Sequence, residues 1–180
     1  MAAPDSVLQF WFEELRPDQW FNKNHQLDAE MRERFSPLLA AAAKGELAGW
    51  RVTPLGRLAE IILLDQFSRN IYRDSPRAFA QDLLALALAE EAVGTGADRE
   101  LPPTHKAFLY LPYMHSESKQ VHEKALQLFS QPGLEGNLEY EKRHKAIIDQ
   151  FGRYPHRNEI LGRTSTPEEI EFLKKPGSSF

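Results

Sequence analysis

The sequence predicts an all-α protein, a single domain over residues 1–180 built as a bundle of about seven to nine helices. Apolar residues recur at spacings of three and four along most of the chain, and no segment sustains the alternation of a strand. Cap residues followed by proline open several of these segments, and glycine closes others. A chain of 180 residues with 42% hydrophobic and 27% charged residues is also typical of one globular core.

Two helices are predicted near the N-terminus. The first covers about residues 6–15 and ends before Pro17, because proline cannot continue a helix. The second covers about residues 26–44. We expect it to bend at Pro37 and to end at Gly45.

The middle of the chain carries two clear start signals. Thr53–Pro54 is a cap followed by proline at the first helical position. The helix that it opens is apolar on every side over Ile61–Leu64, so we expect it at the centre of the bundle. Ser75–Pro76 repeats the start signal, and the helix after it is predicted to run to about Val93 and to end at Gly94.

Four further helices are predicted in the last third. The first two cover about residues 104–111 and 116–129, and we expect Pro112 to separate them. The third covers residues 137–151. A capping box at Thr166–Glu169 opens a short last helix.

Composition excludes several classes of function. A net charge of -4 disfavours nucleic acid as a partner, since phosphate backbones attract basic proteins. The chain has no cysteine, no run of about 20 apolar residues and no basic leader in residues 1–16. We therefore expect a cytoplasmic protein without membrane segments or thiolate chemistry. The oligomeric state stays open.

A short string occurs twice, 84 residues apart. The matching positions are Asp65, Gln66, Phe67, Arg69 and Arg73 in the first copy and Asp149, Gln150, Phe151, Arg153 and Arg157 in the second copy. Each copy follows a run of isoleucine and leucine, so each is placed where a buried helix emerges towards solvent. We therefore expect the two helix ends to converge.

Four segments resemble a bacterial family catalogued as domain of unknown function 924. They are Leu8–Phe12, Leu63–Asn70, Tyr110–Glu117 and Phe151–Asn158. The resemblance extends over nearly the whole chain and implies a tetratricopeptide-like arrangement of antiparallel helices. The family brings no established activity and no catalytic residues.

The repeated arginines have two interpretations. An aspartate four residues before an arginine is a stabilising helix pair worth about 0.2–0.5 kcal/mol, so the pairs can be purely structural. The arginines also outnumber the acidic residues within the two copies, and guanidinium groups bind carboxylates and phosphates. The second interpretation predicts an anion pocket. Its candidate residues are Arg69, Asn70, Arg73, His115, Ser116, Arg153, His156, Arg157 and Asn158.

We expect the ligand of this pocket to be a small anionic molecule or the carboxylate of a peptide. One alternative is an enzyme that acts on a phosphorylated or carboxylated metabolite, with His115 or His156 as general acid or base. Another is a protein-interaction scaffold in which every arginine is paired internally. Ser116 also fits a helix cap. No metal site or cofactor is expected, because no pair of histidines has the spacing of a helical zinc motif.

Two further expectations concern aromatic residues. Those of the first third should be core: Phe10, Trp11, Phe12, Trp20, Phe21, Phe35 and Trp50. Residues 178–180 should fray, as small polar termini do. In the alternative, the ring and carboxylate of Phe180 dock in the arginine pocket.

Overall fold

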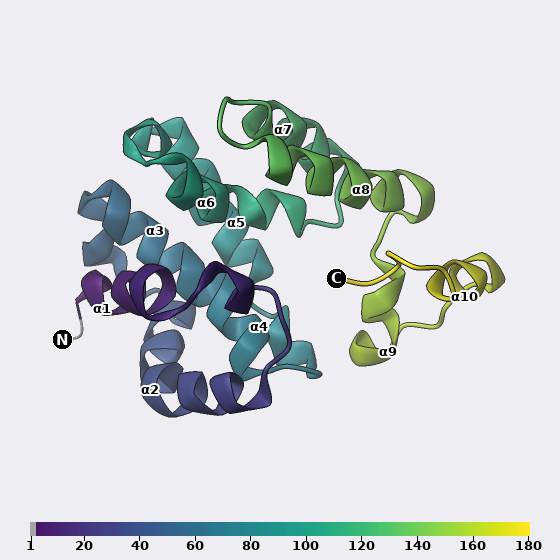
Figure 1. The fold of residues 1–180 in the computed structure, drawn as a ribbon, viewed down its shortest axis with the longest axis horizontal. Coiled ribbons are helices and arrows are strands. Elements are labelled where there is room, and N and C mark those ends of the chain that lie inside the picture. Colours follow the sequence, from purple (N-terminus) through teal and green to yellow (C-terminus); the bar gives the residue numbers. More distant parts are fainter. Residues whose placement is uncertain (1–2) are drawn as a thin grey trace.

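A computed structural model describes residues 3–180, which are 73% helical and contain no strand (Figure 1). This confirms the all-α class and is consistent with seven to nine helices, because two of the ten α segments described in residues 3–180 form one continuous helical path. The helices are α1 (Pro4–Gln9), α2 (His25–Ala43), α3 (Pro54–Ile62), α4 (Ser68–Ile71), α5 (Asp82–Gly94), α6 (Pro103–Met114), α7 (Lys119–Phe129), α8 (Glu135–Phe151), α9 (Asn158–Leu161) and α10 (Pro167–Leu173). Within residues 3–180, no helix has both the length and the apolar character needed to cross a membrane. The tetratricopeptide-like arrangement stays a prediction.

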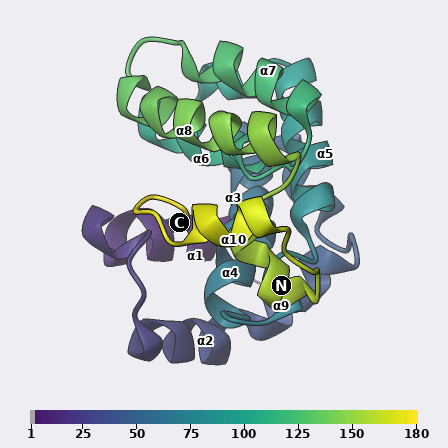
Figure 2. The same cartoon turned by 90° about the vertical axis from the view of Figure 1, so that its right-hand side faces the viewer.

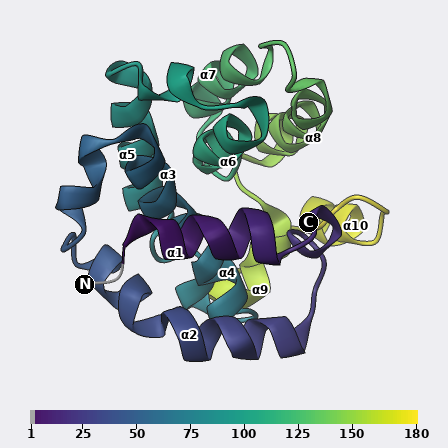
Figure 3. The same cartoon turned by 60° about the vertical axis from the view of Figure 1, so that its left-hand side comes forward.

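Helix α3 occupies the centre, as its composition predicts. The Thr53 side chain accepts the N–H of Gly56 and caps the helix, and Pro54 is the first helical residue. Helix α3 continues through a π-helical turn, Leu63–Phe67, into α4. All side chains of Ile61–Leu64 are completely buried. Helices α1, α5 and α6 pack against α3, and Figure 3 shows α1 crossing in front of it.

The chain after α8 returns to the first half of the molecule. Figure 2 shows α9 and α10 below α8 and in front of α4. Two interactions fix this return: Arg163 binds Glu117 at 2.8 and 3.0 Å, and Arg157 donates a hydrogen bond to the carbonyl oxygen of His115 at 3.0 Å. The segment after α8 therefore forms one wall of the space between α4 and α8.

Most of the aromatic residues in the first third are core residues, as predicted. Phe10, Trp11 and Phe35 are at most 5% exposed, and their rings pack around the ring of Phe67. Phe12, Trp20 and Trp50 are partly buried against the same core. Phe21 is the exception, since 66% of it is exposed.

Pro112 does not end α6, contrary to the prediction. The helix runs from Pro103 to Met114, and Pro112 lies in its last turn, where it removes only one intrahelical hydrogen bond. The N-cap of α7 is Ser118, and not Ser116 as the sequence predicted. Ser118 accepts the N–H of Val121 at 3.4 Å, whereas Ser116 accepts only the N–H of Ser118.

The start signal at Ser75 opens a single 3-10 turn, Pro76–Ala78, and α5 begins only at Asp82. A local cap predicts where a helix starts but not that it stops after one turn. The break places the ring of Phe79 4.5 Å from the guanidinium carbon of Arg157. The break between the 3-10 turn and α5 therefore coincides with a contact between Phe79 and a residue far along the chain.

Candidate functional site

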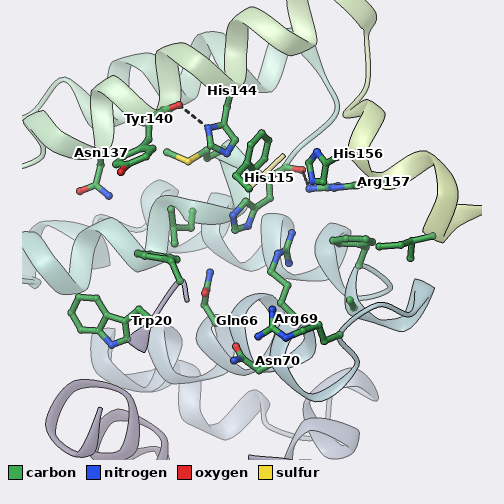
Figure 4. A pocket seen from close by; sticks show the side chains of 18 of the residues that line it. Trp20, Gln66, Arg69, Asn70, His115, Asn137, Tyr140, His144, His156 and Arg157 are labelled. Atoms are coloured by element: carbon green, nitrogen blue, oxygen red, sulfur yellow. Dashed lines mark hydrogen bonds between the residues drawn. The ribbon is translucent and has the colours of Figure 1, made fainter. Parts of the chain in front are cut away.

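A cavity of about 670 Å³ lies between α4, α6, α8 and the segment before α9 (Figure 4). We refer to it as the central cavity. One side is polar and is lined by Gln66, Arg69, Asn70, Arg73, His115 and Arg157. The other side is mainly apolar and is lined by Trp20, Phe21, Met114, Tyr140, Ile160 and Phe180. The imidazole of His144 lies near Tyr140, and that of His156 lies beside Arg157.

Six of the nine predicted ligand residues line this cavity: Arg69, Asn70, Arg73, His115, His156 and Arg157. Ser116 lines a smaller neighbouring cavity of about 340 Å³, which also contacts His115 and Arg157. Arg153 and Asn158 line neither cavity. Both donate hydrogen bonds to the buried carboxylate of Glu169, at distances of 2.8–3.1 Å.

The two copies of the repeated string differ because only the first lies inside a continuous helical path. Asp65 is completely buried. Asp149 is exposed and binds Lys145 at 2.7 Å. Helix α8 ends at Phe151, and Gly152 has a φ of 73°, so the arginines of the second copy do not share a helix face with Asp149.

Asp65 is the centre of a hydrogen-bond network on the polar side. Its carboxylate is 2.7 Å from Nδ1 of His115, accepts the amide of Gln66 at 2.8 Å and lies 3.2 Å from Nη1 of Arg69. Burial opposes ionisation of this carboxyl, but the hydrogen bond from His115 and the charge of Arg69 outweigh burial and lower the pKa of Asp65. The carboxylate is therefore ionised at neutral pH.

His115 is neutral under the same conditions. Burial and then the charge of Arg69 lower the pKa of His115 below its usual value of 6.5, although Asp65 acts in the opposite direction. With Asp65 ionised, Nδ1 carries the proton that it donates to this carboxylate. The other ring nitrogen, Nε2, keeps a free lone pair. Its ring lines the central cavity.

Arg157 is the least compensated cation of the site. It is 5% exposed, and its guanidinium stacks between the rings of Phe79 and Tyr154 at 4.5 and 4.8 Å. Its one hydrogen bond goes to the carbonyl oxygen of His115 at 3.0 Å, and its buried Nε has no partner within residues 3–180. The carboxylate of Asp82 is 3.5 Å away.

Asp82 is already engaged by a second arginine of the site, Arg69. Arg69 binds its two carboxylate oxygens at 2.7 and 3.0 Å. Burial, followed by the charge of Arg69, lowers the pKa of Arg157. An arginine still remains charged near pH 7, so two guanidinium groups share this carboxylate.

Two imidazoles and an aromatic ring form a further part of the cavity wall. His144 donates its Nδ1 proton to the carbonyl of Tyr140 at 2.7 Å, and burial lowers its pKa to about 3. Burial, together with Arg157, lowers the pKa of His156 to about 4, and its buried Nδ1 has no partner within the described residues. The ring of Phe180 lies 3.7 Å from the ring of His144. The ring of Phe180 thus packs against the cavity, and fraying of residues 178–180 stays a prediction.

The surplus of arginine charge inferred from the repeated string is largely compensated by acidic residues from other helices. Asp28 of α2 binds Arg73 and Asn70, and Asp82 of α5 binds Arg69. Glu117 and Glu169 bind the arginines outside the cavity. Counting charges within two short strings could not reveal these partners, because each comes from a distant segment.

Sequence reasoning also missed the apolar residues of the site. Tyr140 and His144 recur at helical spacing on α8, a pattern that predicts only a shared helix face. Trp20 and Phe21 were expected in the core. No local signal indicates that these side chains line a cavity. Among residues 3–180, no group of His, Cys, Asp and Glu side chains is suited to hold a metal ion.

The fold and site together define an all-helical protein with an arginine- and histidine-lined internal cavity. Residues 7–177 match the family model described as "Bacterial protein of unknown function (DUF924)", and the chain belongs to this family. It is similar to a solved structure, "Structure of Protein of Unknown Function ATU0120 from Agrobacterium tumefaciens", with 37% identity and a TM-score of 0.90. That similarity covers 95% of this chain and 96% of the other. Comparison with curated proteins gives no match.

Proposed function

We propose that the protein binds a small organic anion in the central cavity, with Arg157 as its principal anchor. The supporting observation is the incomplete pairing of this buried guanidinium. Its nearest carboxylate is 3.5 Å away and is held by Arg69, and its one hydrogen-bond acceptor is an uncharged carbonyl. A buried cation without a close counter-ion is costly, and a bound carboxylate or phosphate would supply the missing charge.

The size and lining of the cavity support a small molecule as the ligand. Pockets for small ligands usually measure about 300–1,000 Å³ and combine apolar walls with a few polar groups. The central cavity, at about 670 Å³, has this composition. A carboxylate at the end of a peptide would present the same group to Arg157 and is the other form of ligand that we consider.

The test is a titration of the purified protein with inorganic phosphate and a panel of carboxylates, in which binding is measured by thermal shift and by calorimetry. Arg157→Gln removes the anchor, and Arg153→Ala is the matched control, since Arg153 is paired with Glu169 outside the cavity. We expect wild type and Arg153→Ala to bind with the same affinity and Arg157→Gln to lose at least about tenfold.

Circular dichroism establishes that each variant is folded before binding is compared. Failure of the whole panel to bind to wild type would contradict the proposal. Equal binding by folded Arg157→Gln would contradict the role of the anchor. The first result would favour the scaffold interpretation, in which the arginines serve only stability, and the second would place the bound anion away from Arg157.

A second candidate function is catalysis, and the contact between Asp65 and His115 favours it. A neutral imidazole that is oriented by a buried carboxylate and has a free Nε2 is the arrangement of a general base. Arg69 and Arg157 would then stabilise negative charge on the reacting group. His156, with its lowered pKa, is the other histidine candidate.

Catalysis is tested on any ligand identified by the titration. The ligand is incubated with the protein and followed by NMR for conversion. We expect His115→Gln to keep affinity within about threefold while turnover stops. Absence of conversion by the wild-type protein would leave binding as the function.

A further inference from the structure

The central cavity has two chemically different ends, and this bears on the class of ligand. At one end, the charged Arg157 is joined by His115 and Arg69. At the other, the aromatic side chains of Phe21, Tyr140 and Phe180 are 66%, 59% and 54% exposed. An inorganic anion would use only the first end. A ligand that uses both must carry an anionic group and an apolar body.

The structure already shows an aromatic ring at the apolar end. The ring of Phe180 lies 3.7 Å from the ring of His144, 4.5 Å from that of His156 and 5.2 Å from that of Tyr154, measured between centroids. Three aromatic side chains of the protein thus form a place in which a phenyl ring fits. A flat ring suits this place, because two imidazoles and a phenol ring contact it.

The segment that carries Phe180 is held weakly. Among its last residues, the one side-chain hydrogen bond is from Ser178 to the carbonyl oxygen of Leu173, at 3.1 Å. Gly177 has a φ of 77° and turns the chain towards the cavity. Phe180 itself makes no hydrogen bond among the described residues and is half exposed. A ring held in this way can be displaced by another ring.

Tyr154 connects the two ends of the cavity. Its ring lies 4.8 Å from the guanidinium carbon of Arg157 and 5.2 Å from the ring of Phe180. It is completely buried, and its hydroxyl donates to the carbonyl of Met114, so it is fixed in place. A ligand that reaches from the guanidinium to the ring site must therefore carry its anion and its ring on a short spacer.

We propose that the ligand is an aryl-alkyl carboxylate whose carboxylate binds Arg157 and whose ring replaces that of Phe180. This proposal rests on the proposed binding of an anion in the central cavity and specifies the ligand class. The phenylalanine side chain is then a competing occupant, which occupies the ring site until the ligand displaces it.

The experiment compares three probes by isothermal titration calorimetry on the full chain. 3-Phenylpropionate carries ring and charge, propionate carries only the charge, and 3-phenylpropanamide carries only the ring. We expect 3-phenylpropionate to bind about tenfold more tightly than propionate, since burying part of a phenyl ring contributes about this factor. We expect the amide to bind more weakly than 3-phenylpropionate, again by about tenfold, because it cannot neutralise Arg157.

The variant Phe180→Ala separates a competing occupant from a permanent wall. Without the competing ring, 3-phenylpropionate should bind several-fold more tightly, and the affinity for propionate should change by less than about twofold. The substitution removes a half-exposed side chain, so the fold is retained, and circular dichroism checks this.

Two results would overturn the inference while the anion site stands: equal affinities for propionate and 3-phenylpropionate, or weaker binding of 3-phenylpropionate to Phe180→Ala. In the latter case Phe180 is part of the wall. If propionate, 3-phenylpropionate and inorganic phosphate all fail to bind, the proposed anion site itself is wrong, and the inference about ligand class falls with it.

Discussion

Replacing Glu169 by glutamine should lower the free energy of unfolding at neutral pH, and the difference from wild type should shrink in acid. The Glu169 carboxylate is 2% exposed and accepts hydrogen bonds from Arg153 at 2.8 and 3.0 Å and from the backbone N–H of Thr166 at 3.0 Å. The interaction with Arg153 is the main cause that lowers the pKa of Glu169 from the usual 4.5 to about 2. The carboxylate is therefore much more stable in the folded protein than in the unfolded chain.

The size of the effect follows from that pKa. A change from 4.5 to about 2 corresponds to about 3 kcal/mol of folding free energy. The side chain of Arg153 is 30% exposed, and solvent screening reduces the figure to about 2 kcal/mol. Because the pKa is lowered on folding, this stabilisation is fully present above pH 4.5 and is lost as the pH falls towards 2.

The assay is urea unfolding of wild type and Glu169→Gln between pH 7 and pH 3. Glutamine can keep the capping interaction with Thr166, but its NH2 group cannot accept the hydrogen bonds that Arg153 and Asn158 donate to Oε2. The part of the difference that depends on pH therefore reports the charge. The control is Glu168→Gln, which removes an exposed charge from the same turn. We expect the difference from wild type to be about 2 kcal/mol at pH 7 and to shrink steadily below pH 4.5. A difference that is independent of pH would refute the reasoning.

Gly56→Ala should destabilise the protein by about 2 kcal/mol or more in urea unfolding, because the new Cβ would lie 1.9 Å from the carbonyl oxygen of Trp50. Gly136→Ala, with nothing within 4 Å, is its control and should be neutral or stabilising. Asp82→Asn should lower the melting temperature yet tighten the binding of 3-phenylpropionate in calorimetry, since it removes the carboxylate that Arg69 and Arg157 share. Unchanged or weaker binding would contradict this. The affinity for 3-phenylpropionate should vary by less than about twofold between pH 6 and 8. The reason is that His144 and His156, with pKa values lowered to about 3 and about 4, do not titrate there. A change centred near pH 6.5 would show that a histidine of the site titrates normally.

Helix positions were predictable wherever the signal is local. The cap at Thr53, the proline that follows it and the apolar run Ile61–Leu64 each appear in the structure in their expected roles. The capping box at Thr166 is also formed. These features depend on residues within one helical turn, where spacing alone determines which groups meet.

The errors arise where distant segments decide the outcome. The turn after Ser75 stops at Ala78, and α6 continues through Pro112, although the local residues favour the opposite in each case. The same limitation affected the candidate site. Arg153 and Asn158 were expected to be ligand residues, but both bind Glu169, a residue of the last helix that no neighbouring position identifies as their partner.

The repeated string identified arginines that line the central cavity, but the structure supports only part of the reasoning that led to them. Arg69 of the first copy and Arg157 of the second copy line one cavity, but Arg157 lies beyond the end of α8, so the two helix ends themselves do not meet there. The two arginines meet through Asp82, which belongs to neither copy and binds Arg69 far more closely than Arg157. If each arginine were paired with the aspartate of its own copy, no arginine would lack a counter-ion that a ligand could supply. It is the unequal sharing of one carboxylate that leaves Arg157 short of a counter-ion, and a bound anion can supply it.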